Sequence, residues 1–478
     1  MRDFCKQFYR PNNATLVLVG DFNPPDAKLL VEKYFGSIPA GPSVPKVEIP
    51  IPRIVSAKCA AVTDRVELPC VYKAWITAPA YQPGDADLDV LARILGGGGA
   101  SRLNQNLIQQ KQLAQDIQVD QRSMMLGSVF SIWATAKPGV AIEELECAVE
   151  TELESIRAGG PEPQEVERTK NRIQSEMVFS LERAGGKSGL ADRLNTYNHY
   201  LGDPDYIARD GARYATVSAE SVRHAANTLA PESCVTIWGL PGAKVLADVP
   251  KRTDVEVDLP ANDADASESW RSDPPRTSIQ QFTKLPIPVR MTLANGLTLL
   301  FLEQRHIPAF SVNLTVQGGR SANPVDLPGL ASYTTEMLAR GTVRRTQVQI
   351  AAEFETLGAN WSVASNASAS VASLQVLTHR AEAALELFSD LILNPKFDED
   401  EIQKRRKKRQ VGISQRRDNP AQLAEEHFAA ALFGYNIPTD FWKAGRRNPT
   451  RRSRGRNYRC SIRMCSGLIR LRSLSLGI

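Results

Sequence analysis

The chain has 478 residues, and its 42% hydrophobic and 23% charged residues are typical of an ordinary globular protein of about two to four domains. No apolar run reaches about 18 residues, so we expect no membrane span. The net charge of +5 comes from residues 441–478, which hold ten Arg and one Lys without an acid. The first 440 residues carry 47 basic residues (58 less 11) against 53 acidic ones. A nucleic-acid-binding protein more often carries its charge on a folded face, so we expect no nucleic-acid partner.

The first 48 residues are expected to be the end of a domain whose beginning is absent. Ala14–Gly20 is a short apolar run with β-branched residues, which predicts a buried strand. Asp26–Phe35 has the apolar spacing of a helix, and Gly36 follows as its end. One strand and one helix cannot bury a core by themselves, so these residues do not form a domain alone.

A second unit is predicted over residues 49–242, where strand and helix patterns alternate. Its predicted strands are Val71–Ala78, Ser128–Ala136 and Val235–Gly239. Its predicted helices are Asp85–Leu95, Ile142–Ile156 and Pro163–Leu181. The last helix begins with proline and acidic residues, which suit a helix N-terminus. Trp75 and Trp133 lie in the strands and are predicted to be core residues. The mixture of strands and long helices indicates an α+β fold.

Residues 243–284 are polar and rich in Pro, Asp and Ser, which predicts an extended interdomain linker. A third unit follows over residues 285–440. Its predicted strands are Leu297–Leu302 and Ala309–Val316, and its predicted helices are Leu327–Arg340, Arg380–Leu391 and Asp398–Gln415. Residues 441–478 have two interpretations. They are a disordered basic tail, or they are the product of a shifted reading frame, which commonly yields Arg-rich sequence without acids.

Four features invite a site and have a plainer interpretation. The seven cysteines form no C-x-x-C pair or Cys/His zinc spacing, so we expect reduced, individually buried thiols. Gly96–Gly99 lacks the following Gly-Lys-Ser/Thr of a phosphate loop, which favours a flexible turn. The basic run Lys404–Arg409 sits in a helical pattern, which favours a solvated helix face over nuclear localisation or nucleic-acid binding. His427, after Glu425 and Glu426, has no partner and is predicted to be a surface or capping residue.

Several segments occur in an order found in one known family. They are Phe8–Phe22 (FYRPNNATLVLVGDF), Tyr34–Pro39, Leu95–Leu107 (LGGGGASRLNQNL), Leu293–Leu297 (LANGL), Val316–Ser321 (VQGGRS) and the frame from Gly329 to Thr342. Together, over about residues 4–436, they resemble the pitrilysin/insulinase family of zinc metallopeptidases, the inverzincins. The resemblance implies tandem domains, each a β-sheet packed against helices, in two halves that close as a clamshell around a chamber. Residues 1–48 would end the first peptidase-like domain, 49–242 would form the second, and 285–440 a truncated third of inactive type.

Active members of that family resemble one another in an H-x-x-E-H helix and a distant Glu. Two His one turn apart can bind one zinc ion, and the Glu between them can activate the bound water. None of the five His residues here lies four residues from another. The matching frame places Ser332, Thr335 and Glu336 at the motif positions, and Gly412 near the third ligand's position. We therefore predict no catalytic, cofactor-binding or metal-binding residue in this chain.

The family's Arg and Tyr that handle substrate are matched here by Ile108 and Gln115, as in a first-half second domain. The first hypothesis is a fragment of a zinc-dependent metalloendopeptidase, inert as given, whose full-length parent holds the zinc and hydrolyses peptides in a closed chamber. The alternative is a non-catalytic subunit that binds peptide or completes the chamber of a catalytic partner half. A third hypothesis is a structural subunit of a respiratory or processing complex. The sequence does not indicate substrate, compartment or oligomeric state.

Overall fold

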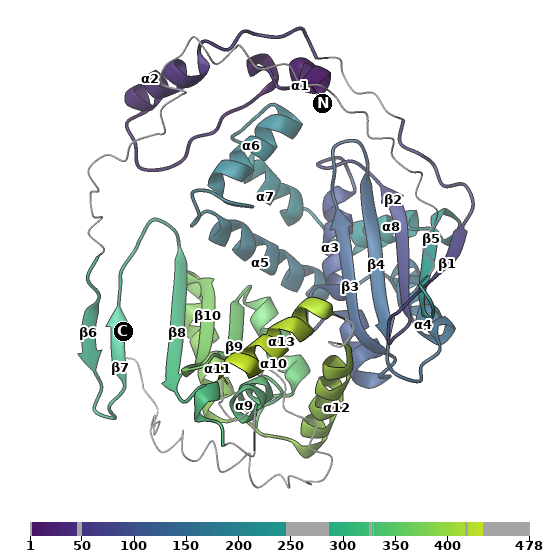
Figure 1. The fold of residues 1–478 in the computed structure, drawn as a ribbon, viewed down its shortest axis with the longest axis vertical. Coiled ribbons are helices and arrows are strands. Elements are labelled where there is room, and N and C mark those ends of the chain that lie inside the picture. The colour runs from purple at the N-terminus through teal and green to yellow at the C-terminus, as the bar shows by residue number, and fades with distance from the viewer. Residues whose placement is uncertain are drawn as a thin grey trace.

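The computed structural model describes residues 2–44, 50–244, 286–324, 327, 329–415 and 419–433. The predicted linker, apart from its first two residues, and the whole Arg-rich tail lie outside the described residues. Figure 1 shows two sheets with helices packed against them, one formed by residues 58–241 and the other by residues 309–377. The fold is α+β, as predicted.

The first sheet has five strands in the order β1-β5-β2-β4-β3. β1 and β5 pair in parallel, whereas β2 pairs antiparallel with both β5 and β4, and β3 pairs antiparallel with β4. The strands are β1 (Lys58–Asp64), β2 (Cys70–Thr77), β3 (Ala114–Arg122), β4 (Ser128–Ala136) and β5 (Val235–Pro241). The three strand predictions in this region are therefore confirmed, while β1 and β3 were not predicted.

Six helices belong to the same region. They are α3 (Asp85–Gly96), α4 (Ile142–Gly159), α5 (Pro163–Ser180), α6 (Leu190–Leu201), α7 (Ile207–Ala215) and α8 (Ala219–Thr228), with a π-helical turn η2 (Asn104–Gln110). Helices α3, α4 and α8 bring Leu91, Leu145 and Val222 into one core with the sheet. A capping box between Glu162 and Glu165 begins α5.

The two tryptophans of this sheet lie on opposite faces. Trp75 is 1% exposed and packs edge-on against Phe130 in the core. Trp133 is 44% exposed, so the prediction that it is a core residue is wrong. Side chains alternate along a strand, and Ile132 already points into the core, which puts Trp133 on the other face. There it lies opposite the exposed Tyr72 of β2.

The second sheet has three antiparallel strands in the order β8-β10-β9. They are β8 (Ala309–Gln317), β9 (Asn360–Ser365) and β10 (Ala369–Leu377), and they pack against α10 (Gln347–Thr356) and α11 (Ala381–Leu393). The core between them contains Ile350, Phe354, Leu374 and Leu387. A separate hairpin joins β6 (Val289–Thr292) to β7 (Thr298–Phe301), and Gly296 has the positive φ of +88° that its turn requires.

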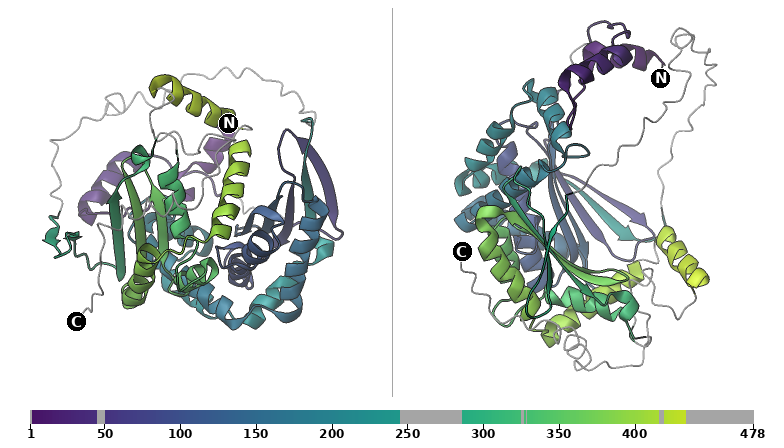
Figure 2. Two further views of the ribbon diagram at one scale, coloured as in Figure 1. Left: turned by 90° about the horizontal axis from the view of Figure 1, so that it is seen from below. Right: turned by 90° about the vertical axis from the view of Figure 1, so that its left-hand side faces the viewer.

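The remaining helices of the described ranges lie outside these two groups. They are α1 (Arg2–Phe8), α2 (Pro24–Phe35), α9 (Leu330–Leu338), α12 (Glu399–Gln415) and α13 (Pro420–Phe433). The predicted helices at α2, α9, α11 and α12 are confirmed. Figure 2 shows the two sheets from two further directions, and its right-hand view shows the N-terminal helices apart from both of them. Among the helices of the described ranges, none is both long and apolar enough to cross a bilayer.

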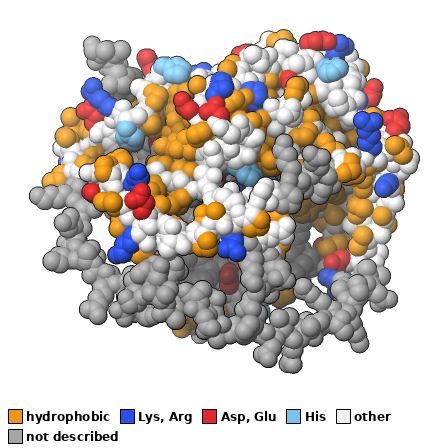
Figure 3. Space-filling view, turned by 90° about the horizontal axis from the view of Figure 1, so that it is seen from above, with side chains coloured by type: hydrophobic (Ala, Val, Ile, Leu, Met, Phe, Trp, Pro, Cys, Tyr) orange, Lys and Arg blue, Asp and Glu red, His pale blue; other side chains and the backbone are white. Residues whose placement is uncertain are grey.

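Residues 2–44 lie against little of the molecule. The predicted strand Ala14–Gly20 is wrong, because this segment is irregular and no described strand runs beside it to complete a ladder. Its helix α2 buries no residue, and Leu29, Leu30 and Phe35 are more than half exposed. Figure 3 shows the molecule from the side of α1 and α2, where hydrophobic side chains cover much of the surface. An apolar surface of this kind is typical of a segment that packs against something else.

Among the five cysteines that the structure describes, the prediction of individually buried thiols holds for one. Cys234 is buried and Cys70 half-buried, whereas Cys5, Cys59 and Cys147 are exposed, and all five are free thiols. Cys5 lies in the poorly packed first segment, and Cys59 lies in the edge strand β1, where few side chains cover it. Cys460 and Cys465 lie outside the described residues.

Candidate functional site

The residues at the motif positions lie on α9, and the hydroxyls of two of them, Ser332 and Thr335, turn toward its own backbone. Ser332 Oγ donates to the carbonyl of Gly329 at 2.9 Å, and Thr335 Oγ1 donates to the carbonyls of Ala331 and Ser332 at 3.2 and 3.0 Å. Thr335 is also 4% exposed. Its hydroxyl is therefore occupied with backbone acceptors and is not available to activate a water molecule.

Helix α12 packs along α9 through a small apolar cluster. Tyr333 and Met337 of α9 contact Ile402, and the Tyr333 hydroxyl donates to the carbonyl of Ile402 at 2.6 Å. This packing fixes the register of the two helices. It brings Arg405 and Arg409, which are one turn apart on α12, opposite residues that are one turn apart on α9.

The two arginines bond to the motif positions. Arg405 Nε donates to Glu336 Oε2 at 2.5 Å, and Arg409 Nη2 donates to Ser332 Oγ at 2.6 Å. The Arg409 guanidinium also lies 5.6 Å from the centre of the Tyr333 ring. The prediction that Lys404–Arg409 is a solvated helix face is therefore wrong for these two residues. Helical spacing alone gave no sign that α12 would turn part of its basic face toward α9.

These residues do not fit a zinc ion. Zinc needs converging lone pairs from His, Cys or carboxylate side chains, and a guanidinium offers donors only. The one carboxylate at the motif positions, that of Glu336, already accepts from Arg405. Gly412, near the third ligand's position on α12, has no side chain. In the described part of the chain, no group of three His, Cys, Asp or Glu side chains could hold a metal.

A pocket of about 370 Å³ opens beside this helix pair, between α12 and the first sheet. The residues at the substrate-handling positions, Ile108 of η2 and Gln115 of β3, line one wall. Arg340, just after α9, and several basic residues of α12 line the other. The structure thus brings together two sets of positions that lie more than 200 residues apart in the sequence.

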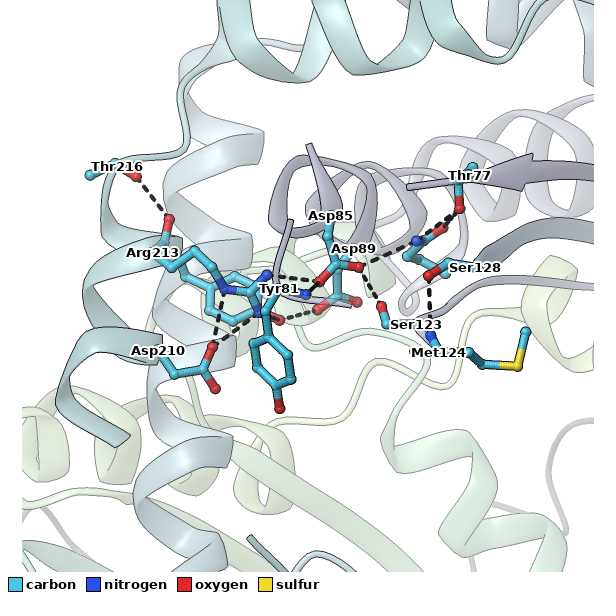
Figure 4. Close-up of polar contacts among 12 residues, drawn as sticks. Thr77, Tyr81, Asp85, Asp89, Ser123, Met124, Ser128, Asp210, Arg213 and Thr216 are labelled. Carbon is cyan, nitrogen blue, oxygen red and sulfur yellow. Dashed lines mark hydrogen bonds and ion pairs between the residues drawn. The ribbon is translucent and has the colours of Figure 1, made fainter. Parts of the chain in front are cut away.

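A second polar cluster surrounds Asp85 at the start of α3 (Figure 4). Asp85 Oδ1 accepts from Ser123 Oγ at 2.5 Å, and Asp85 Oδ2 accepts from the backbone N–H of Tyr81 at 2.9 Å and from Arg213 Nη1 at 2.8 Å. Arg213 also pairs with Asp210 at 3.0 Å and lies over the Tyr81 ring. Asp85 is 3% exposed, so it is a buried charge with a full set of partners.

This Asp85 cluster has the properties of a structural anchor. Tyr81 has a φ of +62°, which costs a non-glycine residue free energy, and the bond from its N–H to Asp85 stabilises that turn. Burial raises the pKa of Tyr81 to about 12, so its phenol stays protonated. Burial likewise raises the pKa of Asp89, which accepts from the Tyr214 hydroxyl at 3.0 Å. No group here is free to bind or activate a substrate. The sequence carried no signal for it, because Arg213 and Asp85 are 128 residues apart.

His427 is exposed on α13, as predicted for a surface residue. Gly96 ends α3, and the predicted turn follows at Gly97–Gly99 with a closely packed backbone, while its predicted flexibility stays a prediction. A Cβ on Gly98 would lie 2.4 Å from Glu355 of α10. Glu355 accepts from the N–H of Ala100 and pairs with Arg168 at 3.2 Å. The glycines therefore let α10 approach the first unit closely, which is a packing role.

Two family models match the chain. One described as "Peptidase M16 inactive domain" matches residues 1–173, and one described as "Insulinase (Peptidase family M16)" matches residues 300–438. The chain belongs to the pitrilysin/insulinase family. The resemblance noted from the short segments is thus confirmed. Two of the relatives described next are named as zinc proteases.

Curated relatives match over part of their length. The zinc protease PqqE of Helicobacter pylori is 28% identical over 212 residues, which are 43% of this chain and 47% of that protein. An uncharacterized zinc protease of Rickettsia bellii is 32% identical over 142 residues, which are 30% of this chain and 34% of that protein. The β subunit of the mitochondrial-processing peptidase of Lentinula edodes is 26% identical over 160 residues, a third of each protein. The matches span less than half the length of these relatives.

Solved structures of the family also resemble this chain. The periplasmic protease PqqL of Escherichia coli matches with a TM-score of 0.42 and 13% identity, over 92% of this chain and 52% of that chain. A protease from Helicobacter pylori matches with a TM-score of 0.46 and 22% identity, over 50% of this chain and 58% of that chain.

Proposed function

We propose that this chain is a non-catalytic part of a zinc-dependent metalloendopeptidase of the pitrilysin/insulinase family. The full-length parent would hydrolyse peptides in a closed chamber with a zinc ion held by residues outside this chain. The residues described above would form part of the chamber wall and bind peptide. The domain bounds predicted from the sequence, at residues 48, 242, 284 and 440, are part of this proposal.

One observation carries the proposal: arginine side chains bond to the positions where an active member would hold zinc. Arg405 and Arg409 present positive charge to Glu336 and Ser332. A divalent cation between α9 and α12 would be repelled by both guanidinium groups. The helix pair is therefore suited to packing and charge pairing, and unsuited to activating water.

A second candidate is a separate subunit that completes the chamber of a catalytic partner half. Two observations favour it. Among the relatives are a β and an α subunit of mitochondrial-processing peptidases. The first 44 residues also expose apolar side chains such as Leu29 and Phe35, which would be covered by a partner. In both candidates this chain binds peptide and does not cleave it.

Peptide cleavage and peptide binding by the purified chain test the proposal together. A quenched fluorescent peptide library with added zinc measures cleavage, and fluorescence anisotropy with labelled peptides of the same library measures binding. We expect binding without turnover. Turnover that a chelator abolishes and that Glu336→Gln also abolishes would overturn the proposal, because it would place a working metal centre on α9.

A further inference from the structure

The pocket between α12 and the first sheet, called the basic pocket from here on, has walls from both units. The wall on the side of the first sheet contains Ile108 of η2, Gln115 of β3 and Lys137 of the turn after β4. The wall on the side of α9 and α12 contains Arg340, Arg405 and Lys408. Its volume of about 370 Å³ lies in the range of small-ligand sites, which is roughly 300–1,000 Å³. Figure 1 shows α12 close to the end of the first sheet where β3 begins.

The charge of the basic pocket is strongly unbalanced. Its lining contains six basic side chains and one acidic one, Glu401. Glu401 pairs with Lys404 at 2.7 Å, and Glu336 of α9 pairs with Arg405. No ion pair with a described carboxylate is formed by the other four cations, Lys137, Arg340, Lys407 and Lys408.

Another pocket, between α5 and the second sheet, shows a different pattern. It has a volume of about 500 Å³ and is also lined by several charged residues. Most of its charges are paired, since Arg93 bonds to Glu176 at 2.7 Å and Arg193 lies 3.9 Å from Asp210. The basic pocket differs from this one in that four of its cations form no ion pair with a described carboxylate, two of them half-buried (Lys137, Arg340) and two exposed (Lys407, Lys408).

The cations of the basic pocket destabilise one another. Partial removal from water lowers the pKa of Lys408, and Arg405 and Arg340 lower it further, although Asp116 and Glu336 offset part of this effect. Partial removal from water also lowers the pKa of Lys137, and Lys408, Lys404 and Lys407 across the pocket lower it further. Arg340 Nε is buried without a hydrogen-bond partner among the described residues. An incoming anion would relieve this repulsion and supply the missing acceptors.

We propose that the basic pocket binds carboxylate side chains of an acidic peptide. This inference rests on the proposed function, because it names the chemical class of the peptide that the chain would hold. Lys137 from one wall and Arg340 and Lys408 from the other provide donors for Asp or Glu side chains. The glutamine side chains of η2 and β3 provide donors and acceptors for a peptide backbone, and Ile108 provides apolar contact for the side-chain stems. The pocket is too small to admit a nucleic-acid duplex.

Anisotropy with two labelled ten-residue peptides tests the inference in the full chain. One peptide alternates Glu with Ala and Gly, and the other has Gln at every Glu position. We expect the acidic peptide to bind at least about tenfold more tightly, and to weaken as salt rises from 50 to 500 mM because the charges are then screened. Inorganic phosphate at 1 mM is expected to leave this binding unchanged. Displacement by phosphate would assign the pocket to a free oxyanion and overturn the inference.

Charge-neutralising variants test whether the acidic peptide binds in the basic pocket. The double substitution Lys137→Gln and Lys408→Gln is expected to remove at least about nine tenths of the affinity for the acidic peptide, with little effect on the neutral one. Both changes relieve like-charge repulsion, so the thermal unfolding temperature should be equal or higher. Lys58→Gln, on the exposed end of β1, is the matched control and should bind as the wild type does.

The outcomes separate this inference from the proposed function. Equal binding of the acidic and neutral peptides would overturn the inference and leave peptide binding in place. Selective acidic binding that survives the double substitution would also overturn it, because the site would lie elsewhere. Binding of neither peptide, together with zinc-dependent turnover of the library, would contradict the proposed function itself.

Discussion

Restoring the H-x-x-E-H motif on α9 should not by itself create a good zinc site. The variant Ser332→His, Thr335→Glu and Glu336→His, called the restored-motif variant, places two imidazoles one turn apart. Arg405 and Arg409 now lie 2.5 and 2.6 Å from the atoms at those positions. Because zinc lies about 2.0–2.1 Å from a His nitrogen, the ion would sit within about 4–5 Å of both guanidinium groups.

The size of the repulsion follows from this distance. Two unit charges 4 Å apart interact by about 4 kcal/mol at an effective dielectric constant of 20, and a divalent ion doubles that value. The Arg405 side chain is 21% exposed, so solvent and side-chain movement reduce the effect. If about 2 kcal/mol remains for each arginine, the two together weaken zinc binding on the order of several hundredfold, at 1.4 kcal/mol for each factor of ten.

Competition with a chromophoric zinc chelator measures the affinity. We expect the restored-motif variant to gain at least about 100-fold in zinc affinity when Arg405→Gln and Arg409→Gln are added. Lys407→Gln is the matched control, because it removes one charge from the same helix without touching α9, and it should change the affinity by less than about threefold. Equal zinc affinity with and without the two arginines would refute the electrostatic reasoning.

Three further predictions concern stability, each measured by urea unfolding. Gly358→Ala should destabilise the contact of the two units by about 1–3 kcal/mol, since its Cβ would lie 2.2 Å from Ser175 Oγ; Gly139→Ala, also at positive φ but in open space, should cost less. Asp85→Ala should cost about 3 kcal/mol because it removes one of the two buried carboxylates that pair with Arg213 and leaves the Tyr81 N–H and the Ser123 hydroxyl without their acceptor. Asp390→Asn should destabilise at neutral pH. Burial alone raises the pKa of Asp390, but bonds from Asn394, Thr342 and Arg345 hold it below 3.8, so this stabilisation is present above that value and lost as the pH falls further.

Sequence patterns predicted the helices and strands whose apolar residues recur at a regular spacing along the chain. The helices at α3, α4 and α5 have apolar residues at regular helical spacing, and β4 has a clear alternation, so these elements were placed within a few residues. Helices α6 and α7 were missed because they bury few residues and carry many polar ones. The strand Ala14–Gly20 failed for the opposite reason. Its pattern is that of a strand, but a strand also needs a neighbour, which no local pattern reports.

The sequence identifies which residues stand at the motif positions and does not identify the contacts that they make. The sequence alone showed that no two His lie four residues apart. It did not show that Arg405 would reach Glu336, because that contact depends on how α12 packs on α9. The basic pocket could not be predicted for the same reason. Lys137 and Lys408 are distant in sequence, and only the packing of the two units makes them neighbours.

Anomalous X-ray scattering at the zinc absorption edge tests the central claim most directly. Crystals of the unmodified chain would be soaked in a millimolar zinc salt before data collection. The account predicts that the guanidinium groups of Arg405 and Arg409 stay bonded to Glu336 and Ser332, with no anomalous peak between α9 and α12. A strong peak there, with both arginines displaced toward solvent, would contradict it.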